Sequence, residues 1–246
     1  MEKVVRTRAE VSDGARFIGI SFLYLFGALL LTAAVIFGTS LALEALYVSN
    51  PEAAAPVILG IFIGASILEF ITVFVMHLVV LRRNKSILVP YIIYSVLNGL
   101  FLGALAIFLK AYGGFENPYY LYAVAFGITA VMFALMGVAG LLMGRRARII
   151  GLIGVCFLIG AFLFGIANWI WFMIFGGLDT MFLIVSAIST IGVLLITVWD
   201  VARIKVIADE GQGSNNMALY CSFTLYVDFI YIFMRILAFI IRFSRR

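Results

Sequence analysis

The sequence predicts an all-α integral membrane protein with seven transmembrane helices, six of them wrapped around a central, C-terminal seventh. Apolar residues make up 65% of the 246 residues and charged residues only 12%, whereas soluble domains are about one quarter charged. A soluble core of this size could not bury so much apolar surface. The net charge is +5, and the basic residues lie in short clusters between apolar runs. This distribution indicates membrane topology and argues against nucleic acid as a partner.

Seven apolar runs are long enough to cross a bilayer, which takes about 20 residues in a helix. Short segments with turn-forming residues separate the runs, such as Ser49-Asn50-Pro51 and the polar stretch 209–216. No Pro-rich linker or low-complexity tract divides the sequence, so we predict one domain over residues 1–246. The predicted spans are residues 17–43, 57–81, 87–109, 119–143, 149–174, 180–203 and 217–243.

The distribution of lysine and arginine predicts a multi-pass protein with a cytoplasmic N-terminus. The N-terminal tail and the second, fourth and sixth loops are basic, while the alternate loops hold only Lys110, and basic segments favour the cytoplasmic side. The basic C-terminal residues Arg242, Arg245 and Arg246 are an exception, because seven spans place them on the far side. The first run is too long for a signal peptide. The short tails favour a bacterial inner (plasma) membrane, with an endomembrane of a eukaryote as the alternative.

The last apolar stretch carries Asp228 close to its middle. An ionised carboxylate at that depth costs at least ~2.5–3.5 kcal/mol, so the residue needs a protein interior, a partner or a proton. We therefore expect the seventh helix to lie at the centre of the bundle. Arg235 follows seven residues later, too far away for a direct pair, and we expect its side chain to snorkel to the far interface.

Two further acids lie within predicted spans. Asp200, near the cytoplasmic end of the sixth, is either an interfacial charge paired with Arg203 or a partner of Asp228. Two carboxyl groups in contact in a low dielectric cannot both ionise easily, so such a pair shares a proton and can act as a pH switch. Spacing leaves open whether they meet. Glu69, in the second span, is either a protonated structural carboxyl or a ligand in a cation pathway.

Several motifs together resemble the Bax inhibitor-1 family of membrane proteins, including its small bacterial members. The seventh span contains LYVDFIYIF (225–233), which is similar to LYLDFINLF in the family. The sixth contains GVLLITVWDVARIK (192–205), with the family's apolar run followed by Asp and then Ile-Lys. The second contains SILE (66–69) and ends in LRRNK (81–85), and the fourth, ITAVMFALMGVAG (128–140), is a looser match.

The resemblance implies a fold of six helices around a central seventh, which agrees with the position expected for Asp228. It also implies a pH-sensitive calcium leak that an aspartate pair and an arginine latch control. Carried over to this sequence, the pair is Asp200 and Asp228, and the latch is Arg82 or Arg83. Tyr231 departs from the family pattern, because it replaces the usual Asn after the DFI motif.

The leading hypothesis is a passive calcium pathway, gated by protons, without a cofactor and without enzymatic activity. Carboxylate oxygens suit calcium, so Asp200, Asp228 and Glu69 are candidate calcium ligands. One alternative is a non-conducting regulator that binds other membrane proteins, such as a modulator of proteolysis or stress survival. Another is an intramembrane aspartyl protease, although the Gly-x-Gly-Asp context of such enzymes is missing before Asp228.

Overall fold

The computed structural model describes residues 8–81, 86–175, 179–211 and 213–244, and these residues are helical apart from short connections. No strand occurs within them. The helices are α1 (Arg8–Ser49), α2 (Pro51–Leu81), α3 (Leu88–Ala111), α4 (Pro118–Met143), the 3-10 helix η1 (Gly144–Arg146), α5 (Ala147–Phe175), α6 (Asp179–Asp209) and α7 (Asn215–Ser244). The all-helical prediction is therefore confirmed for the described part of the chain.

Local sequence chemistry explains where the helices begin and end. The side chain of Asn50 accepts a hydrogen bond from the backbone amide of Ala53 (3.1 Å), which caps the start of α2 directly before its first residue, Pro51. The hydroxyl of Ser214 accepts in the same way from the amide of Met217 (3.2 Å) at the start of α7. Gly144, with a φ of +51°, adopts the left-handed conformation that ends α4.

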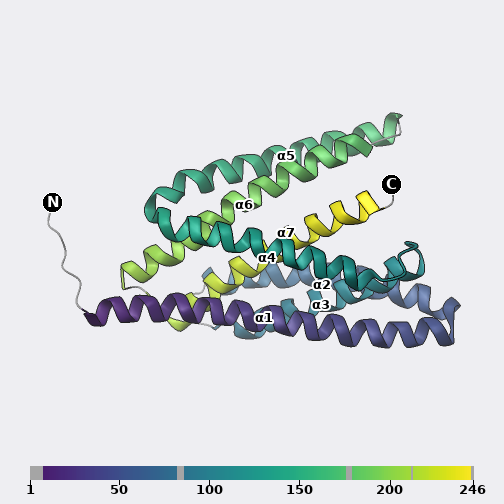
Figure 1. Ribbon diagram of the computed structural model, residues 1–246, viewed down its shortest axis with the longest axis horizontal. Helices are drawn as coiled ribbons and strands as arrows, with labels where there is room; N and C mark the ends of the chain where they lie inside the picture. Colours follow the sequence, from purple (N-terminus) through teal and green to yellow (C-terminus); the bar gives the residue numbers. More distant parts are fainter. Residues whose placement is uncertain (1–7, 82–85, 176–178, 212, 245–246) are drawn as a thin grey trace. The chain divides into compact units, whose positions relative to one another are not determined.

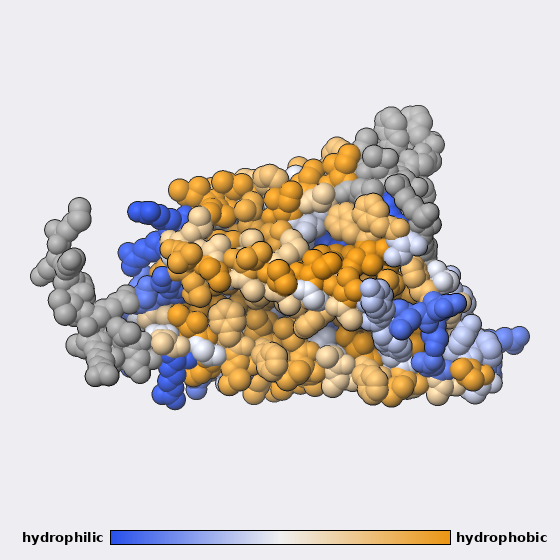
Figure 2. Space-filling view, viewed as in Figure 1, coloured by the Kyte–Doolittle hydropathy of each residue, from blue (hydrophilic) through white to orange (hydrophobic). Residues whose placement is uncertain are grey.

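Among the described residues, six continuous helical stretches are long and apolar enough to cross a membrane. The count is six because α4, η1 and the described part of α5 form one stretch, Pro118–Ile166, of 49 residues. Apolar side chains cover most of the visible flank of α1, and hydrophilic ones gather near its ends (Figure 2). Such helices identify an integral membrane protein that crosses the bilayer several times. The number of seven crossings and the wrapping of six helices around α7 remain predictions.

The helices form two compact units. Unit 1 comprises residues 1–18, 121–213 and 224–246, and unit 2 comprises residues 19–120 and 214–223. Helix α7 thus contributes its first turns to unit 2 and the remainder to unit 1. Within unit 1, α4 and α5 form a helical hairpin, and α6 runs back along α5 (Figure 1). The single domain over residues 1–246 remains a prediction.

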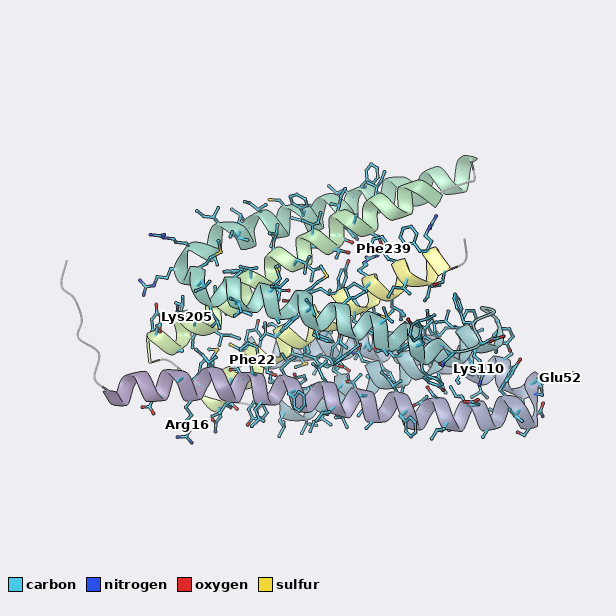
Figure 3. The ribbon with its side chains drawn as sticks, viewed as in Figure 1. Arg16, Phe22, Glu52, Lys110, Lys205 and Phe239 are labelled. Atoms are coloured by element: carbon cyan, nitrogen blue, oxygen red, sulfur yellow. The ribbon has the colours of Figure 1, made fainter. Side chains whose placement is uncertain are left out.

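In unit 2, α1 and α3 pack through small residues. A Cβ at Gly99 would lie 2.5 Å from the Cβ of Val35, and one at Gly103 would lie 2.7 Å from the Cβ of Thr39. Close backbone approach at small residues is a general basis of helix association in lipid. Near the ends of these helices, Lys110 (Figure 3) forms an ion pair with Glu44.

In unit 1, α5 and α6 approach through glycines that face each other. A Cβ at Gly154 would lie 2.8 Å from the carbonyl oxygen of Gly192, and the reverse distance is 3.1 Å. The aromatic ring of Phe229 on α7 packs against Phe126 and Phe133 of α4, each with a centroid separation of 5.5 Å. These contacts place α6 and the larger part of α7 in one packed layer with α4 and α5.

Three helices extend well beyond the predicted spans. Helix α1 covers Arg8–Ser49, α2 begins at Pro51 and α6 continues to Asp209, whereas apolarity predicted 17–43, 57–81 and 180–203. Helix α6 continues because its last turns remain packed: a Cβ at Gly14 of α1 would lie 3.1 Å from the carbonyl oxygen of Ala208. The extension places Asp200 nine residues before the end of α6, deeper than the sequence indicated.

Candidate functional site

Asp200 on α6 and Asp228 on α7 lie together inside unit 1. Only 9% of Asp200 and 8% of Asp228 are exposed, and the two carboxyl groups are close enough to interact electrostatically. Helices α6 and α7 run antiparallel (Figure 1), and α6 continues to Asp209, so both aspartates lie well inside the helical part of unit 1. The two side chains lie within electrostatic range of each other, and whether their carboxyl groups share a proton remains a prediction.

A threonine on each helix bonds to the aspartate of the other helix. The hydroxyl of Thr224 on α7 forms a hydrogen bond with the Asp200 carboxyl, and the hydroxyl of Thr197 on α6 forms one with the Asp228 carboxyl. The spacing from threonine to aspartate is three residues on α6 and four on α7, which places both members on one helical face. The four side chains therefore cross-link the two helices reciprocally.

The Thr197 hydroxyl has two acceptors within reach. One is the backbone carbonyl of Val193, at 2.9 Å, and the other is the Asp228 carboxyl. A hydroxyl has one proton to donate and can also accept, so Thr197 can donate to an ionised Asp228 or accept from a protonated one. One oxygen of the Asp228 carboxyl, Oδ2, is buried without a hydrogen-bond partner among the described residues.

Two basic residues follow Asp200 toward the end of α6. Arg203 lies one turn after Asp200 and interacts with it electrostatically. The ammonium group of Lys205 (Figure 3) donates to the carbonyl of Leu141 at 2.5 Å, which attaches α6 to the end of α4. The predicted latch residues Arg82 and Arg83 lie outside the described residues, as does the side chain of His77.

A second polar cluster lies further along the same two helices. The guanidinium of Arg235 on α7 donates from Nη1 to the Ser186 hydroxyl of α6 (3.1 Å) and from Nη2 to the Tyr231 hydroxyl (2.7 Å). Its Cζ lies 4.9 Å from the centroid of the Tyr231 ring. Arg235 is thus fixed in place by neutral oxygens and an aromatic face. The sequence analysis did not identify the role of Ser186 in this cluster.

Comparison with known proteins agrees with this arrangement of motifs. The family model described as inhibitor of apoptosis-promoting Bax1 matches residues 15–245, nearly the whole chain. The chain belongs to the Bax inhibitor-1 family. It is also similar to an uncharacterised membrane protein of Streptococcus pyogenes serotype M1, with 27% identity over 179 residues, 72% of each chain. No solved structure matches the chain.

This member of the Bax inhibitor-1 family carries a further intramembrane acid, Glu69, in unit 2. Glu69 is half-buried on α2, interacts electrostatically with Tyr94 of α3, and has one buried carboxyl oxygen without a hydrogen-bond partner in the described part of the chain. The described residues contain no group of three or more His, Cys, Asp or Glu side chains that could hold a metal ion. A role for Glu69 as a calcium ligand therefore remains a prediction.

Thr197 and Thr224, which link the two aspartates to the facing helix, were not predicted from the sequence. Their signal was present in the sequence as hydroxyl residues three or four positions before an intramembrane aspartate. Serine and threonine are common within membrane helices, so this spacing alone indicates little. Only the antiparallel register of α6 and α7 distinguishes these two from the other hydroxyl residues.

Proposed function

We propose that this protein is a pH-sensitive calcium leak of a bacterial plasma membrane, with seven crossings and a cytoplasmic N-terminus. Protonation of the pair Asp200 and Asp228 opens the pathway. The proposal is supported by membership of the family together with two buried carboxyl groups in electrostatic contact. An ionised carboxylate within the bilayer costs several kcal/mol unless it is paired, so this pair responds to the proton concentration.

The observation that supports the proposal most directly is the burial of Asp200 and Asp228 within electrostatic range of each other. When Asp228 is ionised, its carboxylate attracts a basic partner, for which Arg82 or Arg83, which follow α2 in the sequence, is our candidate. Protonation removes this attraction, so the ionic contact that closes the pathway is lost.

Calcium flux into proteoliposomes between pH 5 and 8 tests this proposal. We expect the flux of the unaltered protein to rise as the pH falls, because the pair takes up a proton. Asp228→Asn should show flux with little dependence on pH, since the amide is neutral throughout and can donate to Thr197. Asp209→Asn, at the exposed end of the neighbouring helix α6, is the control for loss of an acidic group elsewhere in unit 1 and should behave like the unaltered protein.

Other outcomes distinguish the alternatives. Flux that keeps its full pH dependence in Asp228→Asn would refute the switch. If no calcium flux is detected at any pH, the regulator that acts by binding a membrane protein becomes the better hypothesis, and co-purification in mild detergent would test it. Cleavage of a transmembrane peptide that Asp228→Asn abolishes would favour an aspartyl protease, since such enzymes also bring two aspartates together from neighbouring helices.

A further inference from the structure

Polar side chains continue along the α6–α7 interface of unit 1 beyond the aspartate pair. On α7 they are spaced by four, three and four residues, which keeps them on one helical face. We call these α7 residues, together with their partners on α6, the polar seam. The polar seam consists of Ser186, Thr197 and Asp200 on α6 and Thr224, Asp228, Tyr231 and Arg235 on α7.

The contacts across the polar seam follow one antiparallel register. Asp200 meets Thr224, Thr197 meets Asp228, and Ser186 meets Arg235. Residue numbers fall along α6 as they rise along α7, so these contacts lie at successive levels through the layer. The two aspartates thus occupy two successive levels of the seam, about one helical turn apart, and the arginine occupies a further level.

The charge of Arg235 is not neutralised at its own level. Its hydrogen bonds go to the neutral hydroxyls of Ser186 and Tyr231, and no carboxylate of a described residue lies within ion-pair distance. An arginine keeps its positive charge at every pH that a protein tolerates. Seven residues separate Asp228 from Arg235, which corresponds to about 10 Å along the helix. A cation at the aspartate pair therefore experiences this fixed charge.

We propose that Arg235 determines the charge selectivity of the pathway, as a fixed positive charge that disfavours divalent cations more than monovalent ones. This inference rests on the proposed function, because it needs cations to pass along the seam. At about 10 Å and an effective dielectric constant of about 20, the repulsion of each unit of charge corresponds to roughly a factor of ten in occupancy. Tyr231 acts as a positioning residue that holds the guanidinium beside the path.

The ratio of calcium to potassium flux in proteoliposomes, at an acidic pH where the unaltered protein conducts, tests this inference. We expect Arg235→Gln to raise the ratio about tenfold, because the divalent ion loses twice the repulsion. Arg235→Lys keeps the charge and should leave the ratio near its original value. Arg145→Gln removes a largely exposed arginine in η1 and is the control for loss of a positive charge elsewhere in unit 1.

Two results would overturn the inference. One is an unchanged ratio in Arg235→Gln, and the other is an Arg235→Lys variant that behaves like Arg235→Gln. If Asp228→Asn still alters the pH dependence in the same vesicles, the proposed function stands and only the role of Arg235 falls. Absence of flux in every protein would reject both. If Arg235→Gln does not fold, Tyr231→Phe is tested in its place. We expect a smaller rise in the ratio of calcium to potassium flux, and an unchanged ratio would again contradict the role of Arg235.

Discussion

Two glycines of α4, three residues apart, provide a sensitive test of how closely α4 and α6 pack beside the aspartate pair. A Cβ at Gly140 would lie 2.6 Å from the carbonyl oxygen of Val198 and 2.8 Å from the Cβ of Val201. A Cβ at Gly137 would meet nothing within 4 Å. The obstacle at Gly140 is the backbone of α6, two residues before Asp200, which cannot move aside as a flexible side chain would.

The difference between Gly140→Ala and Gly137→Ala isolates the cost of this contact. Each substitution gains the helix propensity of alanine over glycine, about 1 kcal/mol, and this gain cancels when the two variants are compared. The remaining difference is the overpacking of α6, which costs roughly 1–3 kcal/mol for one added methyl group. Gly137→Ala should therefore be neutral or stabilising, and Gly140→Ala should be the less stable of the two.

Thermal denaturation of both variants in one detergent measures this difference. Since 1 kcal/mol shifts the Tm of a protein of this size by about 2–4 °C, we expect Gly140→Ala to melt at least a few degrees below Gly137→Ala. We also expect altered pH dependence of calcium flux in Gly140→Ala, because the added methyl group displaces α6 beside Asp200. Equal melting temperatures for the two variants would refute the close α4–α6 contact.

Two further predictions concern packing and surface charge in unit 1. Phe229 is 4% exposed and contacts Phe126, which is 49% exposed. Phe229→Ala should therefore lower the free energy of unfolding by about 3 kcal/mol, and Phe126→Ala should lower it by less than about 1 kcal/mol. Melting temperatures measure both effects, and similar losses in the two variants would contradict the burial of Phe229. The ion pair between Arg145 and Glu210 (2.7 Å) is largely exposed on the arginine side. Glu210→Ala should therefore lower the free energy of unfolding by at most about 1 kcal/mol at low salt, and by less at high salt. A larger, salt-independent loss would show a different role for Glu210.

The sequence predicted the helices well because the bilayer imposes a length and an apolar composition on each crossing. The predicted run 119–143 agrees with α4, Pro118–Met143, to within one residue. The prediction was poorer where helices extend into polar sequence, as at the end of α6. There, apolarity ends near Arg203, but packing against α1 at Ala208 continues the helix to Asp209. Hydropathy reports the contact with lipid and does not report contacts between helices.

Packing between helices also decided which glycine pairs matter. Two GxxxG patterns lie within a single α-helix, at Gly60 and Gly64 on α2 and at Gly99 and Gly103 on α3, while a third, Gly140 to Gly144, spans the end of α4. The α3 pair packs tightly against α1, whereas a Cβ at either α2 glycine would meet nothing within 4 Å. The pattern is the same in both helices, so the sequence alone could not distinguish them. The difference depends on which face each helix turns toward its neighbour.

The contacts of Tyr231 explain why it departs from the family pattern. Sequence comparison indicated only that a tyrosine replaces the usual asparagine near Asp228. In the structure its hydroxyl accepts a hydrogen bond from Arg235, one helical turn later, and its ring lies beside the guanidinium. The tyrosine and the arginine therefore form one unit, and a variant of either residue should be interpreted together with the other.

The hydroxyl groups of α6 limit how α7 can bond to them. Ser189, Thr190 and Thr197 each lie within hydrogen-bond distance of a carbonyl of their own helix, as polar side chains within a membrane must find partners. A hydroxyl both donates and accepts, so Thr197 can donate to an ionised Asp228, or it can donate to Val193 and accept from a protonated Asp228. A bond between α6 and α7 at this point is therefore possible in both protonation states. The pH dependence that we propose must then come from the charge of the aspartate pair, because an ionised carboxylate within the bilayer needs a partner of opposite charge and a protonated one does not.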